Sequence, residues 1–150
     1  MVVYRITTAQ WAGRLSPSGY AARWNHAGDY VLYASEHRSL ACLENLIHRS
    51  GNAFAGEFFI TEILIPDEVS VEVLPVPLAN AIFNTHESLL KTGEFGHHWY
   101  TSARSCILKV PSVLIRREHN FVINTRHPLF AEIKTGLIEP FLLDPRFHTS

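Results

Sequence analysis

The spacing of apolar residues predicts four β-strands in the first half of the chain. Residues 2–6 and 31–34 are short runs of β-branched and aromatic residues, and residues 57–65 form a longer run that ends at Pro66. Valine alternates with polar residues over 69–73, which is typical of a strand with one buried face.

A helix is predicted directly after the second of these strands. Leu40, Leu43 and Ile47 recur at the spacing of one helix face, and Ser35 is a favourable N-cap residue. The Ser-Gly-Asn sequence at 50–52 would end this helix, because glycine and asparagine readily adopt the conformation found just past a helix C-terminus.

The second half of the chain predicts shorter elements of both kinds. Asn84 and Glu87 have the spacing of a capping box, which predicts a helix over 85–92 that Gly93 ends, followed by a helix over 94–103. Further strands are expected over residues 105–110, 112–115 and 131–137, with a short extended segment at 120–123, and residues 141–143 end the fold. Strands combined with a few helices indicate the α+β class.

Composition narrows the class of protein. The 150 residues, 47% hydrophobic and 18% charged, suit a single globular domain over 1–150. The net charge of −1 offers no basic surface for direct nucleic-acid binding. No apolar run approaches the roughly 18 residues of a membrane span, and no signal-peptide pattern is present, so we expect a cytoplasmic protein without membrane contact. Cys42 and Cys106 lie in apolar surroundings and are expected to be free, buried thiols.

Glu44 is the first residue whose position suggests chemistry. It follows Leu43 on the predicted helix and so lies at the edge of the apolar face, where a buried, unpaired carboxylate would be unfavourable. Arg23 and Tyr33 come shortly before it, and Ser112 stands in a Pro-Ser turn much later. Taken singly, these four have ordinary interpretations: a solvated helix residue, a surface cation, a core aromatic and a turn residue.

Histidine and glycine patterns disfavour two other kinds of site. The adjacent His97 and His98 would diverge on a helix, and neither His-Glu-x-x-His nor Cys-x-x-Cys is present, so no metal site is expected. The sequence also lacks Gly-x-Gly-x-x-Gly, which disfavours a Rossmann-type dehydrogenase.

Considered in order along the chain, the four candidate residues resemble the RES domain, the toxin half of RES–Xre toxin–antitoxin pairs. Arg23, Glu44 and Ser112 match the arginine, glutamate and serine for which the domain is named, and Tyr33 matches the tyrosine of the intervening strand.

Two later segments, Asn-Thr-Arg-His-Pro at 124–128 and Phe-Leu-Leu-Asp-Pro-Arg at 141–146, also resemble the family's C-terminal pattern. The sequence departs from the family at Ala22, where relatives usually carry glycine, and over 75–94, which matches poorly.

The resemblance implies an ADP-ribosyltransferase-like fold, with central β-sheets and a few short helices, and an enzyme that degrades NAD. Glu44, Arg23 and Tyr33 would be catalytic, and Arg5, Arg23, Tyr33 and Ser112 would bind NAD. An arginine fork suits a diphosphate, an aromatic ring suits nicotinamide or its ribose, and a serine hydroxyl suits ribose or phosphate. The glutamate would stabilise the oxocarbenium ion that develops as nicotinamide leaves. NAD is then the substrate, and no cofactor is expected.

The favoured function is therefore that of a toxin that depletes cellular NAD by cleaving the nicotinamide–ribose bond, with water or phosphate as the acceptor. Two alternatives stay open: ADP-ribosyl transfer to a protein target, and a catalytically inactive binding module of the same fold. The resemblance also implies an Xre-type helix-turn-helix antitoxin that covers the NAD pocket, and it leaves open a homodimer within the toxin–antitoxin complex.

Overall fold

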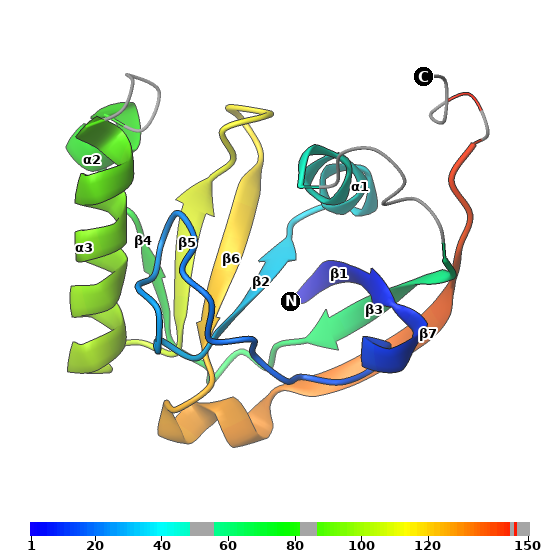
Figure 1. The fold of residues 1–150 in the computed structure, drawn as a ribbon. Helices are drawn as coiled ribbons and strands as arrows, with labels where there is room; N and C mark the ends of the chain where they lie inside the picture. The colour runs from blue at the N-terminus through cyan, green and yellow to red at the C-terminus, as the bar shows by residue number, and fades with distance from the viewer. Residues whose placement is uncertain (49–55, 82–86, 145, 147–150) are drawn as a thin grey trace.

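The computed structural model of the protein describes residues 1–48, 56–81, 87–144 and 146. In this part of the chain, seven strands form one mixed sheet in the order β4-β5-β6-β2-β1-β3-β7 (Figure 1). β4 and β5 run parallel, and the other neighbouring pairs are antiparallel. The strands are β1 (Val2–Thr8), β2 (Val31–Ser35), β3 (Phe58–Leu64), β4 (Val71–Val73), β5 (Ile107–Pro111), β6 (His119–Asn124) and β7 (Lys134–Phe141).

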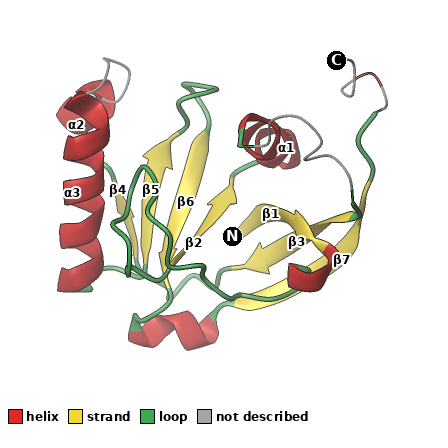
Figure 2. Ribbon diagram, viewed as in Figure 1, coloured by secondary structure: helices red, strands yellow, loops and turns green. Residues whose placement is uncertain are grey.

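The helices lie beside this sheet (Figure 2). Along the chain, strands and helices do not alternate regularly. The helices are α1 (Arg38–Ile47), α2 (Val76–Ala81) and α3 (Glu87–Ser102), and short 3₁₀ turns span Ala9–Trp11 and Pro128–Glu132. A mainly antiparallel sheet with separate helices confirms the predicted α+β class. None of the described helices combines the length and the apolar character needed to cross a bilayer.

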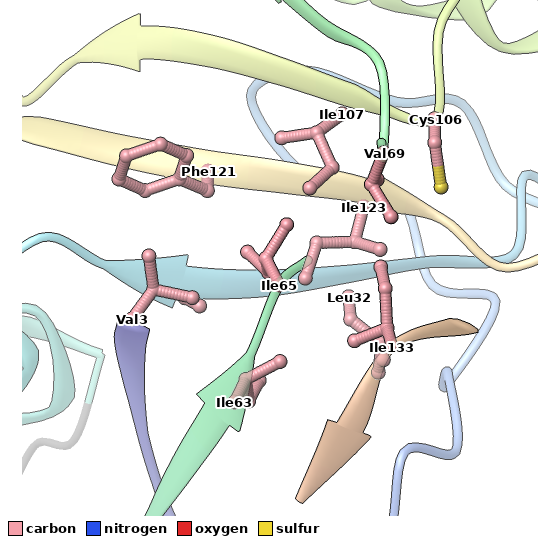
Figure 3. Close-up of a cluster of buried hydrophobic side chains, with 11 residues drawn as sticks. Val3, Leu32, Ile63, Ile65, Val69, Cys106, Ile107, Phe121, Ile123 and Ile133 are labelled. Atoms are coloured by element: carbon pink, nitrogen blue, oxygen red, sulfur yellow. The ribbon is translucent and has the colours of Figure 1, made fainter. Parts of the chain in front are cut away.

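Apolar side chains pack on both faces of the sheet, because successive residues of a strand point to opposite sides. One buried cluster joins residues of β1, β2, β3, β5 and β6, among them Leu32 (Figure 3). The other contains Val31, the neighbour of Leu32, and packs β2, β5 and β6 against Trp99 and Tyr100 of α3. The strands β2, β5 and β6 are therefore covered by buried apolar side chains on both faces.

The sheet opens between its two central strands. β1 is in register with β2 at a single pair, Tyr4 and Ser35, whereas it is in register with β3 at seven pairs from Val2 to Thr8. Because Ser35 is the last residue of β2, β1 and β2 diverge along the rest of β2. Figure 1 shows α1, which follows β2 directly in the chain, lying beside this opening.

Several predicted boundaries are wrong, and each error has a local cause. Ser35 is the last residue of β2 and does not cap α1, whose N-cap position is His37. The Ser35 hydroxyl instead donates a hydrogen bond to Asn120 Oδ1, 2.8 Å away on the neighbouring strand. Residues 112–115 form a turn and not a strand, and the chain pairs again only from His119.

The region after β4 differs most from the prediction. α3 is one continuous helix that passes through Gly93, so the predicted break at this residue is wrong. The strand expected over 131–137 begins only at Lys134, after the 3₁₀ turn, and continues to Phe141. The expected helix end at 50–52 and the Asn84 cap lie outside the described residues.

Candidate functional site

A cavity of about 690 Å³ lies where β1 and β2 diverge. Its walls come from β1, the loop before β2, β2 itself, α1, the turn after β5 and the start of β6. The volume falls within the roughly 300–1,000 Å³ that small-molecule sites usually occupy. Four of the five residues predicted to form the site line this cavity: Arg5, Arg23, Tyr33 and Glu44.

The Glu44 carboxylate is held by two donors on one of its oxygens. Glu44 Oε1 accepts hydrogen bonds from Ser112 Oγ at 3.0 Å and from Asn120 Nδ2 at 2.5 Å. Among the described residues, no hydrogen bond reaches the other oxygen, Oε2. Glu44 is half-buried, so one oxygen is anchored in the protein while the side chain borders the cavity.

Ser112 supports Glu44 from behind and does not reach the cavity. Its side chain is fully buried, and its hydroxyl accepts the backbone N–H groups of Leu114 and Ile115 at 3.0 and 3.2 Å. A hydroxyl offers one donor and two acceptor positions, and the bond to Glu44 completes them. The expected direct contact between Ser112 and NAD therefore does not fit this arrangement, and the serine is placed to orient the carboxylate.

Asn120 is a site residue that the sequence analysis missed. It is the second residue of β6 and pairs with Ser35 of β2, and both residues line the cavity. Its amide oxygen accepts the Ser35 hydroxyl while its amide nitrogen donates to Glu44. A single asparagine in a short β-prone run gives no such signal, because its partner Glu44 lies 76 residues away in the chain.

Arg23 lies in a loop that is pinned to the sheet by Tyr33. The Tyr33 hydroxyl accepts the Trp24 N–H at 3.2 Å and donates to Asn25 Oδ1 at 2.7 Å. The Asn25 amide in turn donates to the backbone carbonyls of Tyr20 and His26. Burial raises the pKa of the Tyr33 phenol well above its usual value, so the hydroxyl keeps the proton that it donates.

Helix α3 fixes the other side of the same loop. Buried Asp29 accepts the His26 N–H at 2.8 Å and faces His97 Nδ1 of α3 at 3.0 Å. A Cβ added to Gly96 would lie 1.8 Å from the Trp24 carbonyl oxygen, so a glycine here lets α3 touch the loop backbone. The loop that carries Arg23 is therefore held in place by contacts within the protein itself.

The two arginines of the cavity differ in their surroundings. Arg5 Nη1 donates to the Arg14 carbonyl at 3.1 Å, and burial lowers the pKa of the Arg5 guanidinium. Arg23 is half-buried on its loop. Within the part of the chain that the structure describes, neither guanidinium forms an ion pair with a carboxylate. Both are therefore available to an anionic ligand in the cavity.

A third arginine holds the helix that carries Glu44. Arg38, at the start of α1, forms ion pairs with Glu62 of β3 at 2.9 Å and with Glu139 of β7. Its guanidinium also lies 5.1 Å from the ring centre of Tyr4, which borders the cavity. These contacts tie α1 to β1, β3 and β7, while Ser112 and Asn120 tie it to β5 and β6.

The described residues offer no candidate cluster for a metal ion. Within residues 1–48, 56–81, 87–144 and 146, no three His, Cys, Asp or Glu side chains gather closely enough to hold a metal ion. Cys42 and Cys106 are both free, with Cys106 buried and Cys42 half-buried.

Comparison with known proteins identifies the family. The RES domain matches residues 2–144, which is nearly the whole chain. The chain belongs to the RES domain family. This RES domain is 35% identical to a protein of Sphingobium sp. (strain YBL2) named "Prs ADP-ribosylating toxin", over 83% of this chain and 78% of that protein. It is 31% identical to "Toxin Res" of Yersinia enterocolitica, over 97% of this chain and 99% of the relative.

A solved structure shares the fold of this RES domain. In the crystal structure of the MbcT–MbcA toxin–antitoxin complex of M. tuberculosis, a chain with 15% sequence identity superposes with a TM-score of 0.73. The match covers 98% of this RES domain and 86% of that chain. The arrangement of strands and helices is thus shared although few residues are.

Proposed function

We propose that this RES domain is a toxin that consumes NAD by cleaving the bond between nicotinamide and ribose. The observation that carries the proposal is the placement of Glu44: its carboxylate, anchored at Oε1, borders the same cavity as the guanidinium groups of Arg5 and Arg23. The relative named an ADP-ribosylating toxin supports it, because ADP-ribosylation takes its ADP-ribose group from NAD.

The cavity residues suit the parts of this substrate. The diphosphate carries negative charge, which Arg5 and Arg23 can balance, and a planar guanidinium can donate two parallel hydrogen bonds to phosphate oxygens. The Tyr33 ring offers an aromatic surface for the nicotinamide or its ribose. Because the Tyr33 hydroxyl is already bonded to Trp24 and Asn25, the ring face is what Tyr33 has left to offer.

Glu44 supplies the negative charge that the reaction requires. As the glycosidic bond breaks, its electron pair leaves with nicotinamide, which becomes neutral and needs no general acid. Positive charge develops on the ribose ring as an oxocarbenium ion, and a preorganised carboxylate stabilises that charge. Water then adds to the ribose carbon and loses a proton, which gives ADP-ribose.

A second acceptor is favoured by the name of the Sphingobium relative, which describes transfer of ADP-ribose. Under this alternative, a nucleophilic group of a protein replaces water in the last step. The roles of Glu44 and the two arginines stay the same, because they act before the acceptor attacks. The two activities therefore differ in their products and not in the candidate site.

An antitoxin of the Xre type, with a helix-turn-helix, is the proposed partner. The name of the structural neighbour describes a toxin–antitoxin complex, and a protein that removes NAD needs neutralising in the cell that makes it. A segment of the antitoxin is expected to cover the cavity between α1 and the Arg23 loop. Co-purification of the two proteins, with loss of NAD cleavage in the complex, tests this partner.

The test of the function is the release of nicotinamide. The purified protein is incubated with NAD, and nicotinamide and ADP-ribose are separated by chromatography, while NAD labelled in the ADP-ribose part reports transfer to protein. Glu44→Gln should lower the rate about 10²-fold or more, on the scale of losing one preorganised electrostatic group. Glu68→Gln changes an exposed glutamate in the same way and should leave the rate unchanged. A folded wild-type protein that releases no nicotinamide would contradict the proposal and favour the binding module.

A further inference from the structure

Four polar side chains, those of Ser35, Asn120, Glu44 and Ser112, form a hydrogen-bonded network that converges on one oxygen of the Glu44 carboxylate. Ser35 Oγ lies 2.8 Å from Asn120 Oδ1, and Asn120 Nδ2 lies 2.5 Å from Glu44 Oε1. Ser112 Oγ approaches the same Glu44 oxygen from another side, at 3.0 Å. The four residues come from β2, β6, α1 and the turn after β5, so this network connects four segments beside the cavity.

The chemistry of the groups fixes the direction of every hydrogen bond in this network. An ionised carboxylate only accepts, so Asn120 must turn its amide nitrogen toward Glu44. Its amide oxygen then faces Ser35, whose hydroxyl must donate. The Ser112 hydroxyl already accepts two backbone N–H groups, so its proton is left for Glu44. The arrangement has one consistent set of donors and acceptors.

Ser112 and Asn120 both donate to Oε1 of Glu44, which leaves Oε2 as the oxygen that can contact a ligand. Two bonds to one oxygen fix the carboxylate plane while leaving the second oxygen without a protein hydrogen bond among the described residues. That oxygen can then meet a ribose hydroxyl, a water molecule or the developing positive charge without first giving up a protein partner. Preorganisation of this kind makes a charge effective in the transition state.

We infer that Asn120 is a positioning residue that fixes the reactive orientation of the Glu44 carboxylate, and that Ser35 fixes Asn120 in turn. The inference rests on the proposed role of Glu44 in NAD cleavage. The side chain of Asn120 is not needed for the ladder, because its backbone pairs with Ser35 in β2 whatever the side chain is. Its place in the cavity lining and its short bond to Glu44 are therefore best explained by what it does to the carboxylate.

The test is a double-mutant cycle measured as nicotinamide release from NAD. Asn120→Ala should lower kcat about 10- to 100-fold, as expected for a hydrogen bond to a charged group, with a much smaller change in KM. In a Glu44→Gln background the same substitution should change kcat less than about threefold, because the charge that Asn120 positions is gone. Ser35→Ala should also lower kcat in the wild-type background, by less than Asn120→Ala does, and should change kcat little in the Glu44→Gln background.

Asn124→Ala is the matched control. Asn124 lies on the same strand, is buried, and donates to the Tyr100 carbonyl at 3.0 Å, but it does not border the cavity. This variant should lower Tm while leaving the kcat of the folded protein unchanged. If Asn120→Ala does not fold, the double-mutant cycle of Ser35→Ala with Glu44→Gln tests the inference instead.

Equal effects of Asn120→Ala in the wild-type and Glu44→Gln backgrounds, or no effect in either, would overturn the inference. Failure of the proposed function looks different, because the wild-type protein would then release no nicotinamide, or Glu44→Gln alone would keep the wild-type rate. The two failures are therefore separated by the single variants before the cycle is complete.

Discussion

Replacing Tyr33 by phenylalanine tests whether the Arg23 loop is held by a hydroxyl or by a ring. The change keeps the aromatic ring and removes the oxygen that bonds to Trp24 N–H and Asn25 Oδ1. Trp24 and Asn25 are 3% and 2% exposed, so two buried polar groups lose their partner. An unsatisfied buried group costs about 1–3 kcal/mol. Because Tyr33 borders the cavity, water can replace part of what is lost, and we expect a total loss of about 2 kcal/mol.

This loss is large enough to measure by thermal unfolding. For a domain of this size, about 2 kcal/mol corresponds to a fall in Tm of roughly 4–8 °C. KM for NAD should rise as well, because the loop that presents Arg23 loses its tether to β2. Tyr30→Phe is the control: Tyr30 is 39% exposed, and no hydrogen bond of its hydroxyl is found among the described residues, so Tm and KM should stay close to wild type.

The pH dependence gives the same prediction an independent check. Burial raises the pKa of Tyr33 in the folded protein, so the protonated phenol is favoured by folding. Its contribution is complete below the ordinary tyrosine pKa of about 10 and is lost as the pH rises above that value. The stability gap between wild type and Tyr33→Phe should therefore narrow in strongly alkaline solution. An unchanged Tm and KM for Tyr33→Phe at neutral pH would refute the tether.

Three further predictions test the cavity and its supports. Arg23→Lys should weaken NAD binding by calorimetry without lowering Tm, because lysine lacks the planar fork, while Arg117→Lys at an exposed position should change neither. Gly96→Ala should destabilise the fold and impair NAD cleavage, because its Cβ would clash with the Trp24 carbonyl, whereas Gly93→Ala, whose nearest contact would be 3.6 Å, should raise Tm slightly. Burial raises the pKa of both thiols, that of Cys106 to about 11, and Cys106 is buried whereas Cys42 is half-buried. Iodoacetamide near neutral pH should therefore modify Cys42 first, as mass spectrometry would detect.

Local periodicity was sufficient where a segment's own residues determine its structure. The predicted strands at 2–6, 31–34 and 57–65 correspond to β1, β2 and β3, and the predicted helix corresponds to α1. Of the apolar face predicted for this helix, Leu40 is buried, but Leu43 and Ile47 are 37% and 66% exposed. In these segments the apolar spacing, the β-branched content and the flanking turn residues agree with one another. Three of the predicted site residues, Arg5, Tyr33 and Glu44, fall in these segments, which is why their elements could be assigned correctly.

The errors occur where a distant contact outweighs local preference. Gly93 ends a helix by its intrinsic preference, yet α3 continues through it, because α3 packs against the Arg23 loop at Gly96. Ser35 is a good N-cap by type, but its hydroxyl is used by Asn120 from the neighbouring strand. No property of the short segment around either residue contains this information.

The opening between β1 and β2 explains why the candidate residues are spaced as they are. Arg5 lies on β1, Arg23 on the loop before β2, Tyr33 on β2 and Glu44 on the helix that follows, so one continuous stretch passes around the cavity and lines it. Ser112 and Asn120 come from a distant stretch and meet this site through Glu44. The first stretch therefore presents groups to the ligand, and the second sets the orientation of one of them. A change in the second stretch should alter turnover more than ligand affinity, and the reverse should hold for the arginines.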